Sequence, residues 1–419
     1  MTDGALSNLK EATARKLDAQ RPRLEEISRF VHANPELGYE EYKASSRLAG
    51  ELAKDGYQVE MPVAGMETAF VARAKSGAGP TIAILSEYDA LPEVDQAGGH
   101  NLIAAASVGV GAVLKDALDE LRGAVWVIGC PAEQGYPEGA GGKVNLLNAG
   151  IFRDVDAAIM IHPSDRFQVW SKPFAREHFK CRFKGRRSRS SENPRDLVNA
   201  VDPAVMTLTS VWALQRRVPA DVVIQYVFSE GGSAPNVMPV EAELRFYVRA
   251  RKLSVMEEVV KQIQTCAQSA ASATGTEVAF AKRAHTYADG IPNLALVSLF
   301  AKNLRALGVE PEPPVKSAER SLKGLKFSST DLGNVSREVP AGTIHIGMGY
   351  GGLHTTYDRA QAIALPVTDG AHNAMMAGAT ALAWTALDLL ASSHLVAAAR
   401  AELATYRSNG YEHPYPTDA

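Results

Sequence analysis

Three uninterrupted apolar runs constrain the fold of this chain more than any other feature of its sequence. They are Thr81–Ser86, Gly123–Cys130 and Val155–Ile161. A strand that is apolar at successive positions is buried on both faces, as in a parallel sheet covered by helices. The intervening segments Ile103–Leu121 and Lys143–Ala149 have the composition of helices. We therefore predict an α/β domain with a mostly parallel sheet flanked by helices.

Helical periodicity covers much of the rest of this domain. Apolar residues spaced among charges predict one amphipathic helix over Glu11–Asn34 and another over Glu40–Asp55. The sequence pattern of the α/β domain resumes from about Asn293, with a short strand predicted at Thr343–Met348 and a long Ala-rich helix at His372–Leu390. These elements predict one α/β domain that is interrupted by a segment with a different sequence pattern.

The interrupting segment begins after about Trp170, where the sequence pattern changes. Apolar and polar residues alternate there, as in strands with one buried face, and two helical segments separate the strands. The strands are expected at 177–183, 222–228, 242–249 and 277–283, and the helices at 202–215 and 254–273. This βαββαβ order predicts an inserted α+β domain of ferredoxin-like type. We expect residues 1–176 and 295–419 to form the α/β domain and residues 177–294 the inserted domain.

Composition argues against several classes of protein. The 44 Lys and Arg residues nearly balance the 47 Asp and Glu residues, so charge offers no case for a nucleic-acid partner. No apolar run reaches about 18 residues and the first residues lack an apolar core, which predicts neither a membrane partner nor a signal peptide. The three cysteines form no CxxC pair, so a disulfide scaffold and a structural zinc finger are not expected. The expected location is the cytoplasm.

Residues that can bind a metal stand at the ends of the predicted strands. Carboxylates and imidazoles follow these strands or open the next helix: Glu87, Asp89, His100, Glu133 and His162, with His354 later in the chain. Open α/β sheets place their ligands at the carboxyl ends of the strands, and these side chains suit a divalent transition metal. A carboxylate beside such a metal can act as a general base on water. The sequence therefore predicts a metal centre at one edge of the sheet.

Several motifs, spread over nearly the whole chain, resemble the M20 family of metallopeptidases and amidohydrolases, in its aminoacylase and aminobenzoyl-glutamate hydrolase branch. They are His32–Gly38, Glu87–Pro92, Pro131–Glu133, Gly231–Val237 and Ser328–Ser336. The resemblance implies two divalent metals and an inserted lid domain through which copies of the chain pair into a homo-oligomer.

The resemblance also assigns roles to individual residues. It implies that His100, His162 and His354 are metal ligands. It further implies that Glu133 is the general base and that Asn236 is a lid residue in contact with substrate.

The chain departs from the pattern of this branch at two metal ligands and in the lid. The ligand cysteine two positions before His100 is Gly98, and the ligand glutamate after the base is Gln134. The usual lid histidine aligns near Arg189. Because an anionic thiolate and an anionic carboxylate are both lost, less negative charge remains to compensate a second cation.

Three interpretations of these departures stand side by side. The chain is an inactive binding protein, an amidohydrolase with a weak second metal site, or an enzyme with one labile Mn²⁺ or Zn²⁺ ion and altered chemistry. We favour the third, because the retained histidines and Glu133 argue for catalysis and one cation needs less compensating charge. In it, Gln134 and Asp89 bind the metal or orient its ligands.

On this interpretation the chain resembles a family outlier that hydrolyses a C–N bond of a small aromatic carboxylate, a step in the degradation of aromatic compounds. The implied reaction is deamination of 5-nitroanthranilate to 5-nitrosalicylate and ammonia, with metal-bound water as nucleophile and Glu133 as base. A small anionic substrate of this kind needs hydrogen-bond donors, and we predict Arg189, Asn236 and Ser329 for that role. The alternative is hydrolysis of N-acyl or aminobenzoyl amino acids.

Overall fold

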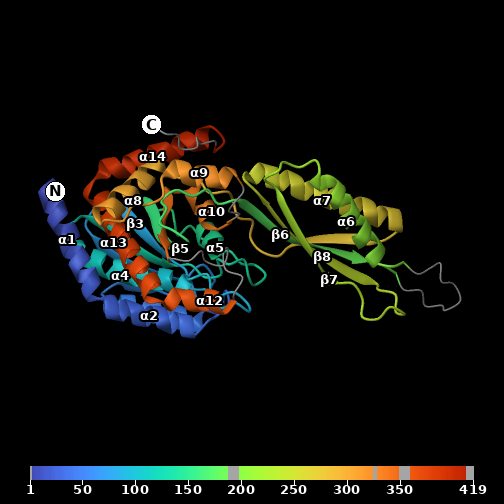
Figure 1. Ribbon diagram of the computed structural model, residues 1–419, viewed down its shortest axis with the longest axis horizontal. Helices are drawn as coiled ribbons and strands as arrows, with labels where there is room; N and C mark the ends of the chain where they lie inside the picture. Colours follow the sequence, from blue (N-terminus) through green and yellow to red (C-terminus); the bar gives the residue numbers. More distant parts are fainter. Residues whose placement is uncertain (1, 187–197, 324–327, 349–358, 412–419) are drawn as a thin grey trace. The chain divides into compact units, whose positions relative to one another are not determined.

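The structure is a computed structural model that describes residues 2–186, 198–323, 328–348 and 359–411 (Figure 1). The chain forms two compact units, which we describe separately. The first comprises residues 1–172, 290–326 and 331–419, and the second comprises residues 173–289 and 327–330.

The first unit is built on a six-stranded sheet with the strand order β1-β2-β4-β3-β5-β10. The strands β3, β4, β5 and β10 are parallel, whereas β2 is antiparallel to β4 and β1 is antiparallel to β2. Their bounds are Gln58–Glu60 (β1), Phe70–Ser76 (β2), Thr81–Ser86 (β3), Gly123–Gly129 (β4), Ala157–Ser164 (β5) and Ala341–Gly347 (β10). The central strands are buried at nearly every position, which explains their uninterrupted apolar sequences. The predicted mostly parallel sheet is confirmed.

Helices flank this sheet. Within the first unit they are α1 (Asp3–Ala19), α2 (Arg21–Ala33), α3 (Tyr42–Lys54), α4 (His100–Ala117), α5 (Gly142–Asn148), α8 (Leu294–Ala306), α9 (Pro314–Leu322), α10 (Leu332–Ser336), α12 (Arg359–Ala364), α13 (Asp369–Ala391) and α14 (Ser393–Ser408), with a short 3₁₀ helix at Leu365–Val367. The long helices α4 and α13 pack against each other and against β5, and α1 and α2 cover them (Figure 1). The helix α13 is long and apolar enough to cross a membrane, but most of it is buried in this core, as expected for a core helix.

The single helix predicted over Glu11–Asn34 is wrong. The segment contains the end of α1 and all of α2, with a break at Gln20. Pro22 lies in the first turn of α2, where its missing N–H needs no partner. Within a continuous helix the ring would clash with the carbonyl of residue 18, so the helix has to restart at this point.

The second unit has the βαββαβ order expected from its alternating pattern. Its elements are β6 (Ala175–Lys184), α6 (Val201–Gln215), β7 (Val223–Glu230), β8 (Glu241–Ala250), α7 (Leu253–Thr274) and β9 (Glu277–Lys282). The strand order is β7-β8-β6-β9 and every pair is antiparallel. Both helices pack on one face of the sheet, over a core that includes Phe179, Leu244 and Phe246 (Figure 1). The ferredoxin-like prediction for the fold is confirmed.

Candidate metal centre

Imidazole and carboxylate side chains come together in the first unit because three neighbouring strands end beside one another. Glu87 follows β3, Glu133 lies in the loop after β4, and His162 lies near the end of β5. His100 is the first residue of α4 and is completely buried. In the parallel sheet these ends share one edge, so residues distant in sequence meet there.

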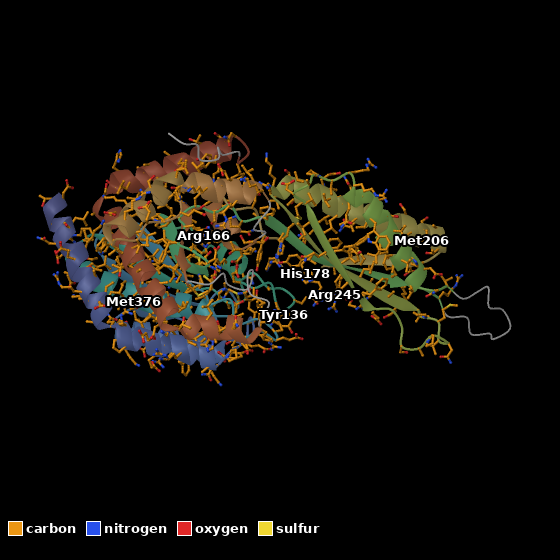
Figure 2. All side chains as sticks on the ribbon, in the orientation of Figure 1. Tyr136, Arg166, His178, Met206, Arg245 and Met376 are labelled. Carbon is orange, nitrogen blue, oxygen red and sulfur yellow. The ribbon has the colours of Figure 1, made fainter. Side chains whose placement is uncertain are left out.

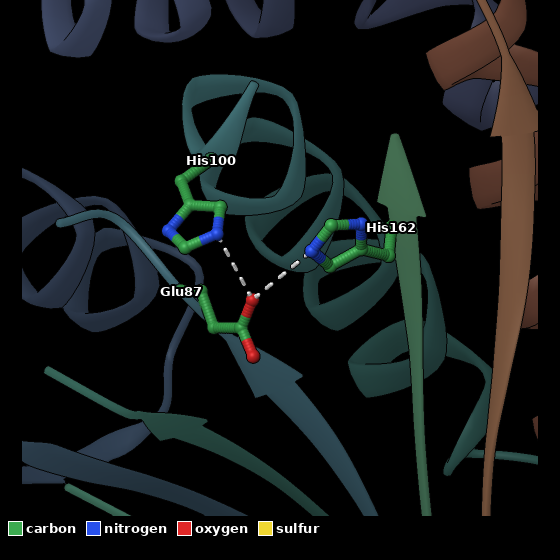
Figure 3. A group of neighbouring side chains, drawn as sticks. All are labelled: Glu87, His100 and His162. Carbon is green, nitrogen blue, oxygen red and sulfur yellow. Dashed lines mark ion pairs between the residues drawn. The ribbon is translucent and has the colours of Figure 1, made fainter. Parts of the chain in front are cut away.

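The two imidazoles face the carboxylate of Glu87. Nε2 of His100 lies 3.4 Å and Nε2 of His162 lies 4.0 Å from Oε2 of Glu87 (Figure 3). The other ring nitrogen of each histidine is engaged elsewhere, since Nδ1 of His100 lies 2.8 Å from Oδ1 of Asp89 and Nδ1 of His162 lies 2.9 Å from the carbonyl oxygen of Pro163. These contacts place a proton on Nδ1 and direct both Nε2 atoms toward one point.

Electrostatics distinguish the two imidazoles. Burial lowers the pKa of His100, but the carboxylates of Asp89, Glu87 and Glu133 outweigh it and raise the pKa to about 9. The pKa of His162 is lowered, chiefly by burial. Two imidazole nitrogens beside a carboxylate are ligands that a divalent transition metal accepts, so the residues fit the cofactor that the sequence predicts.

A buried lysine holds the carboxylate of Glu87 in place. Nζ of Lys143 lies 2.6 Å from Oε1 of Glu87 and 2.5 Å from Oδ1 of Asp331, and all three side chains are inaccessible to solvent. Burial raises the pKa of Glu87, but Lys143 and the two imidazoles more than offset it and bring the pKa to about 2. Glu87 is therefore an anion that is balanced within the protein interior.

The loop that carries Glu133 is anchored by the segment 38–41, which begins at the last residue of the first motif. Oε2 of Glu133 lies 3.9 Å from Nε2 of His100, and burial together with the charge of Glu87 raises the pKa of Glu133 to about 8. The preceding Ala132 has a φ of 54°, an uncommon backbone conformation for alanine, and its N–H donates to Oε1 of Glu41 over 2.8 Å. A Cβ on Gly38 would lie 2.7 Å from Cβ of Ala132, so only glycine allows this close approach.

The two departures from the family pattern fit each other sterically. Nε2 of Gln134 lies 3.0 Å from Nε2 of His100, and the backbone N–H of Gln134 donates to Oδ2 of Asp89 over 2.9 Å. A Cβ added to Gly98 would lie 2.7 Å from Nε2 of Gln134. The amide of Gln134 thus lies where a side chain on residue 98 would begin.

The remaining predicted site residues are not part of this cluster. His354 and Arg189 lie outside the described residues. Asn236 is exposed in the turn between β7 and β8, and Ser329 belongs to residues 327–330, which group with the second unit.

The sequence placed Glu87 among the residues able to bind a metal but assigned it no role. It gave no role to Lys143, and none to Asp331 within the motif Ser328–Ser336. The ion pair between these two residues could not be predicted, because they are 188 positions apart and meet only in the folded chain.

Comparison with known proteins identifies the family. The chain is 34% identical over 415 residues to the Xaa-Arg dipeptidase of Mus musculus, an alignment that covers 95% of this chain and 92% of the relative. The chain belongs to the M20 family of peptidases and amidohydrolases. The family model of the peptidase dimerisation domain matches residues 176–274 of this M20 protein. A p-aminobenzoyl-glutamate hydrolase polypeptide of Escherichia coli (strain K12) is 28% identical over 315 residues, covering 70% of this chain and 64% of the relative.

Solved structures share the fold of this M20 chain. An aminobenzoyl-glutamate utilization protein from Klebsiella pneumoniae matches with a TM-score of 0.70 at 19% identity, covering 89% of this chain and 97% of the other. A dinuclear metal binding peptidase of the M20 family from Bacillus subtilis matches with a TM-score of 0.62 at 20% identity, covering 89% and 99%. The M20 protein is therefore a hydrolase that acts on carbon–nitrogen bonds and depends on a divalent metal.

Proposed function

We propose that this M20 hydrolase cleaves the amide bond of a dipeptide or of an N-acyl or aminobenzoyl amino acid. The observation that carries the proposal is the buried carboxyl of Glu133, whose Oε2 lies 3.9 Å from Nε2 of His100 within the imidazole and carboxylate cluster. A base in this position can take a proton from a water molecule held at the cluster. The names of the mouse and Escherichia coli relatives support an amide substrate next to an amino-acid carboxylate.

Each side chain of the cluster has its own role in amide hydrolysis. His100 and His162 would hold the divalent ion, with His354 as a further predicted ligand. Such an ion, when bound, supplies a Lewis acid that lowers the pKa of water and polarises a carbonyl. Glu133 takes a proton from water as the C–O bond forms, and returns it to the leaving nitrogen as the C–N bond breaks. The products are a carboxylic acid and an amine, and Asp89 and Gln134 keep His100 oriented.

A substrate panel tests this proposal. We expect protein loaded with Mn²⁺ or Zn²⁺ to release the amino acid from an Xaa-Arg dipeptide, an N-acyl amino acid or aminobenzoyl-glutamate, and chelator-treated protein to release none. Product formation is measured by chromatography. If the metal-loaded protein hydrolyses no amide on the panel, the proposed function is wrong.

Deamination of 5-nitroanthranilate is the second candidate. Gly98 and Gln134 favour it, because the loss of two anionic ligands points to chemistry that differs from that of ordinary amidohydrolases. The relatives support amide hydrolysis better, since their names refer to dipeptides and aminobenzoyl-glutamate. Release of ammonia from 5-nitroanthranilate without turnover of any amide would favour this candidate, with Asn236, Ser329 and Arg189 as the predicted donors to the substrate.

We also propose that the protein is cytoplasmic and that its copies form a homo-oligomer. Residues 1–176 and 295–419 form the catalytic domain, and the copies pair through the inserted domain, residues 177–294. The edge strand β7 and the neighbouring helix α6 expose several large apolar side chains: Val205, Met206, Trp212, Tyr226, Val227 and Phe228. Met206 is labelled on α6 in Figure 2. An edge strand beside an apolar helix face favours pairing with a second copy of the same surface.

A charged substitution in β7 tests the interface. Val227 is 54% exposed, and Val227→Lys is expected to reduce the dimer to the monomer mass in light scattering, because an edge lysine opposes strand pairing. The matched control is Ala279→Lys in β9, the opposite edge of the same sheet. A Val227→Lys protein that stays dimeric, or an Ala279→Lys protein that dissociates, would place the interface elsewhere.

A further inference from the structure

We propose that Glu87 is the anionic ligand of a single-ion metal centre that it forms with His100 and His162. The inference rests on the proposed metal-dependent hydrolysis and names a ligand to which the family resemblance assigned no role. It is carried by an unsatisfied oxygen atom, by the orientation of the two imidazoles and by the position of Lys143.

The first observation concerns Oε2 of Glu87. This atom is buried and accepts no hydrogen bond within the described residues. A buried carboxylate oxygen without a hydrogen-bond donor is unfavourable unless a positive charge lies beside it. Its close neighbours are Nε2 of His100 at 3.4 Å and Nε2 of His162 at 4.0 Å (Figure 3).

The second observation is that the Nε2 atoms of both rings face this point. Asp89 and the carbonyl of Pro163 engage the Nδ1 atoms, so Nε2 is the ligand atom of each ring. Nε2 of His100 contacts the amide of Gln134 at 3.0 Å, and that neutral amide moves aside when a metal binds. The two nitrogens and the carboxylate oxygen all lie within 4.8 Å of one another. Ligand atoms at about 2.0–2.2 Å from one zinc ion lie at most about 4.4 Å apart, and both distances from Oε2 of Glu87 are shorter than this.

The third observation is that Lys143 fixes the direction of Glu87. Its ammonium binds Oε1 of Glu87 and Oδ1 of Asp331, so Oε2 of Glu87 is the oxygen that faces the imidazoles. A second group of carboxylates, formed by Glu87, Glu133 and Asp331, lies equally close together. There the ammonium of Lys143 already provides the positive charge, which makes this group the poorer place for an ion.

Glu87 also explains how the centre tolerates the two departures from the family pattern. Gly98 has no side chain to donate, and the amide of Gln134 is neutral. The negative charge that these positions lack is supplied by the end of β3 instead. A single carboxylate with two neutral imidazoles compensates one divalent ion far better than two, so the centre holds one ion per chain.

Metal titration of the full-length protein tests the ligand role of Glu87. The probe is Zn²⁺ in competition with a chromophoric chelator, and Co²⁺ binding is followed in parallel by visible absorption. We expect one ion per chain for the wild type and an affinity at least about 100-fold weaker for Glu87→Gln, at or beyond the upper end of the 10- to 100-fold loss typical of residues that only orient a ligand. The Co²⁺ absorption of the variant should change as well.

The control is Asp388→Asn, which removes another buried carboxylate of the same unit, one that contacts Lys10 and Asn303 rather than the imidazoles or the Glu133 loop. It should keep the wild-type affinity within threefold. Glu87→Gln leaves Lys143 paired with Asp331, and thermal melting checks that it folds. Should it not fold, Glu87→Asp keeps the charge on a shorter side chain, and it should still weaken binding and alter the Co²⁺ absorption.

The outcomes separate this inference from the proposed function. If the wild type binds one ion and Glu87→Gln binds it equally tightly, Glu87 is not a ligand although metal-dependent hydrolysis stands. If the wild type holds two tight ions, the single-ion centre is wrong. If the wild type binds no ion and hydrolyses amides without one, the proposed function fails as well.

Discussion

Replacing Glu133 with glutamine is expected to lower kcat for amide hydrolysis by about 100- to 10 000-fold, the range that a positioned general base contributes. Glutamine has nearly the shape of glutamate but cannot accept the proton from water, so the fall should appear in kcat more than in KM. Steady-state kinetics of the metal-loaded protein measure both constants. The metal content should stay unchanged, because His100 and His162 do not depend on Glu133 for their orientation.

The control for this substitution lies in the same loop. Glu138 is an exposed carboxylate in the segment that separates the Glu133 motif from Gly141, and Glu138→Gln should leave kcat within twofold. If Glu133→Gln retained near wild-type turnover, another group would have to act as the base, and the central residue of the proposed mechanism would be wrong.

Replacing Lys143 with methionine is expected to destabilise the protein by about 3–5 kcal/mol, because it leaves two buried carboxylates without their shared partner. Lys143 is completely buried and contacts Glu87 at 2.6 Å and Asp331 at 2.5 Å. Its pKa is raised well above the usual value, since the two carboxylates outweigh the effect of burial. Methionine retains most of the volume, so the loss reports charge rather than a cavity.

Chemical denaturation of metal-free protein measures this effect. The matched control is Lys75→Met, at an exposed position of β2, which should change the free energy of unfolding by no more than about 0.5 kcal/mol. A loss below about 1 kcal/mol for Lys143→Met would mean that Glu87 and Asp331 take up protons when the lysine is removed. The anchoring of Glu87 by Lys143 would then be weaker than the distances indicate.

The sequence predicted the fold of both units because their signals are local. The runs at Thr81–Ser86 and Val155–Ile161 are apolar at successive positions. A short run of this kind predicts a strand that is buried on both faces. The alternation in 177–183 and 242–249 is equally direct evidence for strands with one buried face. The error over Glu11–Asn34 has a local cause too, since Pro22 was the available sign that the helix restarts.

The sequence by itself determined which chemistry-bearing residues stand at strand ends, because a strand's end is set by the residues within and beside it. Only the tertiary structure decided which of them touch. Glu87 meets Lys143 across 56 positions, and Lys143 meets Asp331 across 188. The fit of Gln134 against Gly98 is likewise a contact between two loops. Such pairings depend on how strands are ordered in the sheet, and no local pattern of polarity records the distance between two side chains that packing brings together.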